Sequence, residues 1–136
     1  MRILILGMDR HVTDISVLAE LTELEYLELF SCPITDLSPL ANHTKLVDLN
    51  ISKCKIRDLS PLESCTALER MWINQNTKIA QEEIDAFQAS HPDCLVSHTL
   101  NHETSNGWRK HWRYKQYLAM FRSGQWCEFV KPETAN

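Results

Sequence analysis

The chain has 136 residues, a net charge of −4, a hydrophobic fraction of 43% and a charged fraction of 24%. This length suits one domain of ordinary size, and the composition excludes wholesale disorder. No apolar run approaches the roughly 20 residues that span a bilayer, and the apolar start after Arg2 is too short for a secretory signal. We therefore expect a globular chain without a membrane span or an export signal.

Charge is unevenly distributed along the chain. Residues 1–98 carry 15 acidic and 8 basic side chains, whereas residues 99–136 carry 3 and 6. The acidic first part argues against bulk nucleic-acid binding, and the basic last part leaves that option open. The five cysteines are odd in number and form no CxxC pair. They favour buried, reduced thiols and a cytoplasmic location, unless the chain is a fragment of a surface or secreted protein.

Seventeen residues are leucine, and the hydrophobic pattern recurs every 22 residues. Three segments align without a gap, namely Val12–Leu18, Ile34–Leu40 and Ile56–Leu62. A second block repeats in phase with the first and begins at Leu24, Leu46 and Leu68. It reads Leu-x-x-Leu-x-Leu-x-x-Cys, and Met, Ile or Asn replaces some of these residues. The alternating apolar residues predict short strands with one buried face, which stack into a parallel sheet.

Other positions of the repeat predict turns. The last position of each strand block lies where the chain turns away, so its side chain can satisfy buried backbone groups (Cys32, Cys54, Asn76). Ser-Pro at 38–39 and 60–61 predicts short 3₁₀ or α turns on the convex side, with serine as N-cap. One aspartate recurs before each of these turns, and we interpret it as a backbone cap rather than a catalytic group (Asp14, Asp36, Asp58).

These motifs resemble the internalin-like class of bacterial leucine-rich repeats, in which a 22-residue repeat carries the signature Ile-Thr-Asp-Leu-Ser-Pro-Leu. The resemblance covers residues 1–98. It implies an α/β fold, a right-handed solenoid with a parallel sheet on its concave side. It also implies that proteins or peptides bind on that concave face, and it implies no chemistry.

Both ends of the predicted array are irregular. Residues 1–9 fit only the strand half of a repeat. Because an uncapped solenoid end exposes apolar surface, we expect a fragment of a longer protein, a minimal cap, or a homo-oligomer formed through this end. At the other end the sequence predicts a helix over 80–90 and a last strand over 94–97, with Cys94 and Val96 facing inward.

Residues 99–136 form a second predicted segment, polar at first and then basic and aromatic. A helical stripe is predicted from the spacing of Tyr114, Tyr117, Leu118 and Phe121, and Gly124 is expected to end the helix. One interpretation is a capping helix that packs on the last repeat, and another is a protein-binding tail. The alternative function is nucleic-acid binding through cations and indole rings, namely Trp108, Arg109, Lys110, Trp112, Arg113 and Lys115.

Strand alternation assigns a set of large side chains to the concave face. We predict that they are exposed and bind a protein or peptide partner, because aromatic residues and arginine dominate interface energies. The set is Tyr26, Glu28, Phe30, Asp48, Asn50, Arg70 and Trp72. Leu95 is expected in the same column as Trp72, and Ile3 and Ile5 add apolar area at the N-terminal edge.

No catalytic motif is present in the sequence: there is no phosphate-binding glycine loop, no G-x-S-x-G and no HExxH. The spacing of Cys94, His98 and His102 permits a metal site only if the region is helical, and Cys94 fits a core position better. We therefore expect neither an enzyme, nor a cofactor, nor a metal centre.

Overall fold

A computed structural model describes residues 1–100 and 107–134. The chain divides into two compact units, Met1–Thr104 and Ser105–Asn136, and each is described by itself. The boundary expected from composition, between residues 98 and 99, lies near this division. Within the described residues no helix is long and apolar enough to cross a membrane.

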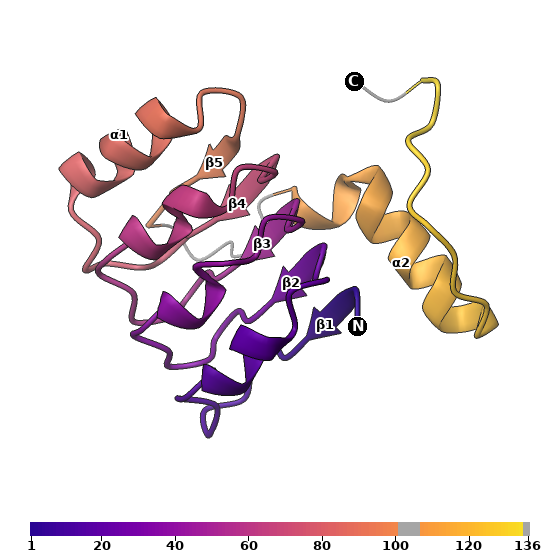
Figure 1. Cartoon of the computed structure of the whole chain (residues 1–136), viewed down its shortest axis with the longest axis horizontal. Coiled ribbons are helices and arrows are strands. Elements are labelled where there is room, and N and C mark those ends of the chain that lie inside the picture. Colours follow the sequence, from indigo (N-terminus) through magenta and orange to yellow (C-terminus); the bar gives the residue numbers. More distant parts are fainter. Residues whose placement is uncertain (101–106, 135–136) are drawn as a thin grey trace. The chain divides into compact units, whose positions relative to one another are not determined.

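The first unit contains one parallel sheet of five three-residue strands (Figure 1). They are β1 (Ile3–Ile5), β2 (Tyr26–Glu28), β3 (Asp48–Asn50), β4 (Arg70–Trp72) and β5 (Leu95–Ser97). Spatial order follows chain order, and the register pairs Leu27 with Leu49 and Leu49 with Met71. The predicted stacking of one strand per repeat is confirmed. We call the strand of one repeat together with its return loop a rung.

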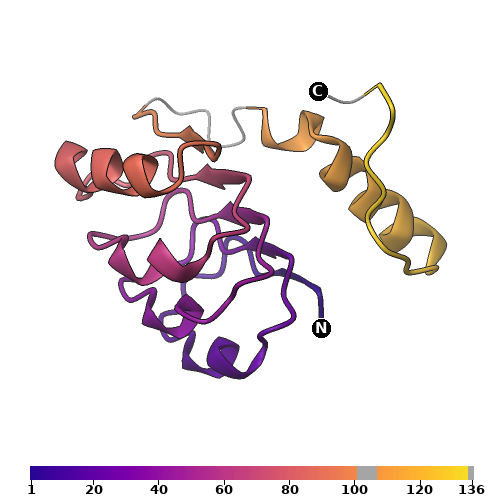
Figure 2. The same cartoon turned by 45° about the horizontal axis from the view of Figure 1, so that its top comes forward.

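The opposite side of this unit carries one short helix per rung (Figure 2). They are the 3₁₀ helices η1 (Ser16–Glu20), η2 (Ser38–Leu40) and η3 (Ser60–Ser64), followed by α1 (Gln81–Ser90). The recurring aspartates cap these turns as predicted: Asp36 Oδ1 accepts a hydrogen bond from the Ser38 amide at 2.8 Å. The expected serine N-caps were wrong: Ser38 is the first residue of η2, Leu37 holds the N-cap position, and the Ser38 hydroxyl donates to Asp36 Oδ2 at 3.0 Å.

The core lies between the sheet and the helices and repeats from rung to rung. In the third rung it consists of Leu46, Leu49, Ile51, Cys54, Ile56, Leu59 and Leu62, all buried. Each short helix and each strand packs on its neighbours in the adjacent rungs. A strand of three residues has little stability alone, so the fold depends on this continuous stack.

The side chain at the turn position that closes each strand block satisfies buried backbone groups, as the sequence predicted, and it also reaches those of the preceding rung. The Cys54 thiol donates to the Leu29 carbonyl oxygen at 3.2 Å. In the next rung Asn76 donates from Nδ2 to the carbonyl oxygens of Ile51, at 2.7 Å, and Ile73, at 3.2 Å. Its Oδ1 accepts from the Ile56 amide at 3.4 Å. One side chain thus satisfies three buried backbone groups.

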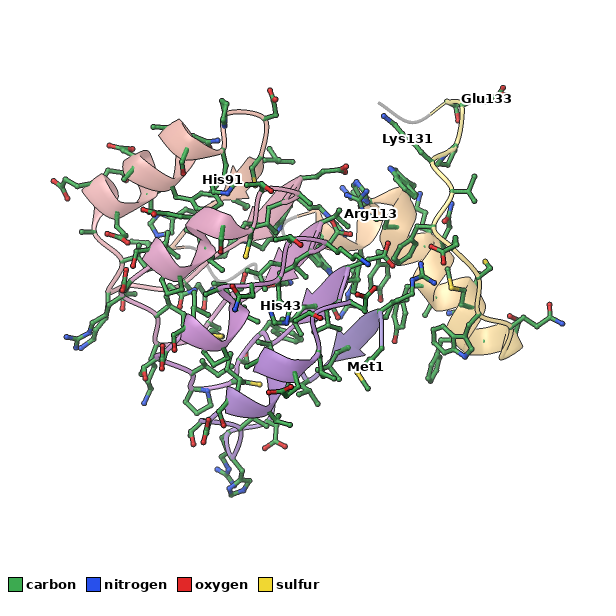
Figure 3. All side chains as sticks on the ribbon, in the orientation of Figure 1. Met1, His43, His91, Arg113, Lys131 and Glu133 are labelled. Atoms are coloured by element: carbon green, nitrogen blue, oxygen red, sulfur yellow. The ribbon has the colours of Figure 1, made fainter. Side chains whose placement is uncertain are left out.

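A buried histidine interrupts the apolar convex side. His43 is fully buried, and it occupies the position of Leu21 and Cys65 in the neighbouring repeats (Figure 3). Neither ring nitrogen has a hydrogen-bond partner among the described residues. Burial lowers the pKa of His43, and nearby backbone carbonyl groups, that of Leu18 among them, oppose this shift only in part. The ring is therefore held neutral.

The second unit is a helix with a return segment. It comprises η4 (Trp108–Lys110) and α2 (Trp112–Ser123), and Gly124 ends α2 in a left-handed conformation with φ of 72°, as predicted. The return segment is fixed by Gln116, whose Oε1 accepts from the Val130 amide at 3.0 Å and whose Nε2 donates to the Val130 carbonyl. The Trp112 ring meets Phe129 edge-on, with centroids 6.4 Å apart.

The expected aromatic stripe of α2 is present but is not its most buried face. Tyr114, Tyr117 and Phe121 contact one another in sequence, with centroid distances of 6.0 and 6.2 Å. The two tyrosines are half-buried and Phe121 is exposed. The side chains that α2 buries are instead Arg113 and Met120. Ring contacts along the helix surface thus account for the helical spacing.

Asn76→Ala should lower the free energy of unfolding by about 2–3 kcal/mol, because it removes three hydrogen bonds to buried backbone groups. Asn76→Cys is the matched control: it restores the residue type of the two preceding rungs and keeps one donor, so its loss should be smaller. Urea denaturation monitored by circular dichroism measures both. Equal losses would contradict the role of the amide.

The buried His43 predicts acid sensitivity. Its folded-state pKa is lowered, so the unfolded chain binds more protons, and stability should fall as the pH drops below the ordinary histidine value of about 6.5. His43→Leu should be more stable than the native chain at pH 5.5, and the advantage should shrink towards pH 8. Thermal unfolding at several pH values measures the difference. A pH-independent difference would show that protonation of His43 does not contribute.

Candidate functional site

The register of the sheet places the predicted concave residues in two rows. The first row is Ile3, Tyr26, Asp48, Arg70 and Leu95, and the second is Ile5, Glu28, Asn50, Trp72 and Ser97. The expected column of Leu95 was wrong, because Leu95 pairs with Arg70 rather than Trp72. The period of 22 breaks after Asn76, where α1 lengthens the connection to β5 and shifts the register.

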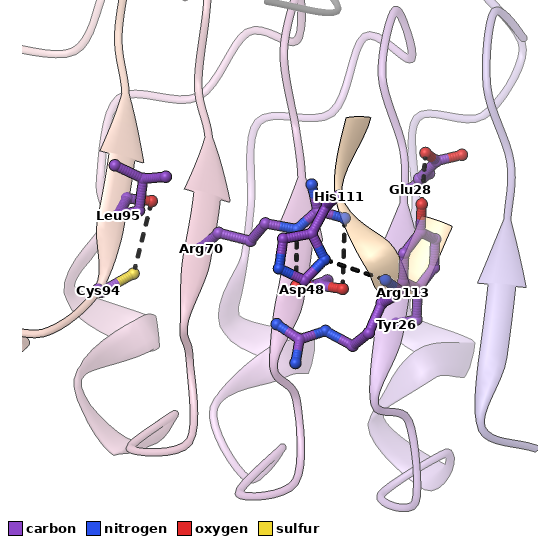
Figure 4. A network of polar contacts seen from close by, with 8 residues as sticks. All are labelled: Tyr26, Glu28, Asp48, Arg70, Cys94, Leu95, His111 and Arg113. Carbon is purple, nitrogen blue, oxygen red and sulfur yellow. Dashed lines mark hydrogen bonds and ion pairs between the residues drawn. The ribbon is translucent and has the colours of Figure 1, made fainter. Parts of the chain in front are cut away.

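A buried ion pair occupies the centre of the first row (Figure 4). Arg70 Nε donates to Asp48 Oδ1 at 2.8 Å, and Nη2 donates to Oδ2 at 3.4 Å. The side chains are only 2% and 0% exposed. The guanidinium also lies 5.5 Å from the centroid of the Trp72 ring, within cation–π distance. Two rungs are thereby joined by a two-point charge contact.

A second polar contact joins the two rows within β2. The Tyr26 hydroxyl donates to Glu28 Oε1 at 2.9 Å (Figure 4). Burial, assisted by the Glu28 carboxylate, raises the pKa of Tyr26 far above its usual value. Tyr26 therefore stays a neutral hydrogen-bond donor at any physiological pH.

The predicted exposure of this face is wrong for most of its members. Six of the seven side chains are buried, and only Phe30 is half-buried. Within the sheet, polar members of the face pair with one another, as Arg70 does with Asp48 and Tyr26 with Glu28. The accessible apolar area instead lies at the C-terminal end of the first row, where Leu95 is 61% exposed. The role of the seven residues in partner binding stays a prediction.

A third row, which the sequence places on the same face at 22-residue spacing but of which only Phe30 is in the predicted binding set, continues the polar network. Asn74 Oδ1 accepts from the Ser97 hydroxyl at 3.0 Å and from the Thr99 amide at 2.9 Å. The Asn74 amide in turn donates to the Ser52 hydroxyl at 3.2 Å. These residues have small or neutral side chains at the turn end of the strands, and their only signal was the 22-residue spacing of Ser52 and Asn74.

Phe30 owes its position to the glycine in the preceding rung. A Cβ atom at Gly7 would lie 2.6 Å from the Phe30 ring. The absence of a side chain at Gly7 thus lets the Phe30 ring lie against the backbone.

The basic aromatic residues do not form one accessible surface. Trp108 and Arg113 are buried, whereas Arg109, Lys110 and Lys115 are exposed. Arg113 lies with its guanidinium 4.7 Å from the Trp112 ring centroid, and its amide donates to His111 Nδ1 at 3.1 Å (Figure 4). Nucleic-acid binding needs freely presented cations and rings, and this arrangement gives it little support.

Cys94 is a core thiol, as the sequence indicated. It is buried, and burial raises its pKa to about 12. His98 is half-buried, and His102 lies outside the described residues. Across the residues that the structure describes, no three His, Cys, Asp or Glu side chains are grouped so as to hold a metal ion.

Comparison with solved structures finds bacterial leucine-rich-repeat proteins. The internalin inlF of Listeria monocytogenes matches with a TM-score of 0.64 and 32% identity, over 75% of this chain and 28% of that chain. Internalin C2 of the same organism matches with a TM-score of 0.57 and 29% identity, over 69% of this chain and 42% of that chain. No protein-family model matches the sequence, and no curated protein is similar to it. The chain thus spans less than half the length of these two relatives.

The ion pair predicts an asymmetric mutational effect. Asp48→Leu should lower the free energy of unfolding by about 3–5 kcal/mol, since it leaves the Arg70 charge buried without its carboxylate. The double variant Asp48→Leu with Arg70→Met should lose much less. Chemical denaturation of the three proteins tests this. A double variant as unstable as the single one would contradict the unpaired-charge explanation.

Proposed function

Because the chain belongs to the internalin-like, 22-residue class of leucine-rich-repeat proteins, we propose that it is a non-catalytic scaffold that binds a protein or peptide on the concave face of its sheet. Its predicted binding set is Tyr26, Glu28, Phe30, Asp48, Asn50, Arg70 and Trp72. Since the chain covers only part of its relatives, this function is proposed for the repeat unit and not for a whole receptor.

One observation carries the proposal. The sheet face opposite the leucine core bears an ion pair, an indole ring and a phenol–carboxylate pair, although a parallel sheet gains core stability from apolar side chains alone. A buried ion pair adds little net stability compared with apolar residues of similar volume. We take its position in the centre of the concave face as a sign of selection for recognition.

The proposed mechanism follows from which side chains have exposed area. Leu95, at the end of the first row, is exposed, and Phe30, which follows the end of β2, is half-buried; both are apolar. Asp48 and Arg70 neutralise each other and are almost fully buried, so their contribution would be to fix the geometry of the face rather than to touch a partner. We propose that apolar anchoring supplies affinity and that the buried pair holds the surrounding face in a fixed geometry.

The test is a pull-down from a nuclease-treated lysate, comparing the native chain with Phe30→Ser, Leu95→Glu. Val17→Glu is the matched control, because Val17 is 70% exposed but lies in η1, on the opposite side from the sheet. A protein retained by the native chain and by the control, and lost with the double variant, is the expected result. Equal retention by all three proteins, or a signal that nuclease abolishes, would overturn the concave-face proposal.

Two further aspects belong to this proposal. We propose a reducing compartment, since the buried thiols of Cys32, Cys54 and Cys65 donate hydrogen bonds to backbone carbonyl oxygens and serve as core groups.

We also propose self-association through β1, whose residues are only half-buried, unlike those of β2 to β4. Light scattering at increasing protein concentration tests it, and a monomer throughout would exclude it.

A further inference from the structure

A second surface of the repeat unit lies away from the concave sheet, on the loops that follow the strands. A hollow of about 590 Å³ opens there across three consecutive rungs. Its lining consists of Thr35, Cys54, Lys55, Arg57, Asp58, Thr77 and Lys78. Cys54 is the buried member of this lining, while the lysines, the arginine and the threonines are exposed. We call this feature the loop groove.

The loop groove has a cationic rim. Three cations of the unit pair with acids of a neighbouring rung, namely Arg2 with Glu25, Lys45 with Glu23, and Arg70 with Asp48, whereas Arg10 and Lys53 are exposed single cations outside the groove in the part of the chain that the structure describes. Lys55, Arg57 and Lys78 also have no acidic partner within 4 Å among the described residues. Three unneutralised cations thus face one hollow.

The acid of the groove does not neutralise this rim. Asp58 Oδ1 accepts from the Ser60 amide at 2.9 Å, where it caps η3. Hydrogen bonds from Ser60 lower the pKa of Asp58. In the other rungs, Asp14 and Asp36 accept in the same way from the amides of Ser16 and Ser38. Asp58 therefore stays ionised and forms no ion pair with the rim, so one carboxylate stands against three cations and the groove keeps a net positive charge.

We propose that the loop groove binds an acidic peptide segment of a protein partner, with carboxylates of that segment paired to Lys55, Arg57 and Lys78. This inference deepens the proposed recognition function by adding a second contact surface on the same rungs. Charge complementarity selects the occupant. Aspartate or glutamate side chains match the rim, and the aliphatic parts of the lysine and threonine side chains can cover the peptide backbone.

The overall charge of the unit argues for a peptide rather than a nucleic acid. Residues 1–98 hold 15 acids against 8 bases, so a long polyanion is repelled by most of this surface. A short acidic segment makes its contacts within the groove, where at physiological salt the charges beyond about 8 Å are largely screened. The groove is thus matched to a few carboxylates.

The proposal is tested by titrating the full chain with a fluorescein-labelled hexaglutamate peptide. Binding is measured by fluorescence polarisation and by amide chemical shifts. We expect binding that weakens with salt, with shifts centred on residues 54–58 and 77–78. The triple variant with Lys55→Gln, Arg57→Gln and Lys78→Gln should bind the peptide at least tenfold more weakly. The matched control Arg10→Gln, Arg122→Gln, Lys131→Gln removes three exposed cations outside the groove and should bind within twofold of the native chain.

A second variant tests the hollow without changing charge. Thr35→Trp fills the groove from an exposed position and should also weaken peptide binding, with unchanged circular dichroism. Equal weakening by both charge variants, shifts centred elsewhere, or tighter binding of a single-stranded oligonucleotide than of the peptide would overturn the proposal. The two surfaces are distinguishable. If the double variant Phe30→Ser, Leu95→Glu loses the pulled-down protein and the native chain binds no hexaglutamate, the groove proposal is rejected and the concave-face proposal stands.

Discussion

The fold depends on how backbone groups are satisfied between successive rungs. A strand of three residues and a single 3₁₀ turn cannot stand alone, and each rung therefore bonds to its neighbours at several points. At the strand end, the thiol of Cys54 and the amide of Asn76 reach the preceding rung and take up carbonyl groups that no strand pairs with. The buried leucines then need only fill the space that these bonds define.

Much of this architecture could be predicted from the sequence because the same physical demands recur every 22 residues. Strand alternation, the aspartate caps and the helix α1 at the end of the repeats each have a local cause, and the structure confirms them. Left-handed residues were missed. Ser31, Lys53 and Gln75 all have φ near 60°, and the Lys53 amide donates to the Asn74 carbonyl at 2.8 Å. Neither glycine nor asparagine marks these positions, so the sequence held no signal for them.

The candidate site was harder to predict than the fold. Alternation identified the face on which Tyr26, Asp48 and Arg70 lie, but it gave no account of how the side chains of adjacent rungs pair with one another. The ion pair between Asp48 and Arg70, the register of Leu95 and the loop groove all depend on contacts between rungs. Such contacts join residues 20 or more positions apart, and the periodicity of the sequence does not show which of these residues touch.

The rung-by-rung packing has a consequence for how the molecule opens. Because every element of the sheet unit packs on adjacent rungs, stability is expected to be greatest in the middle of the stack and least at its edges. The strand β1 has a neighbour on one side only, whereas β3 is covered on both. Fraying from the β1 edge would leave Asp48 and Arg70 together, so the ion pair at the centre of the sheet outlasts partial unfolding.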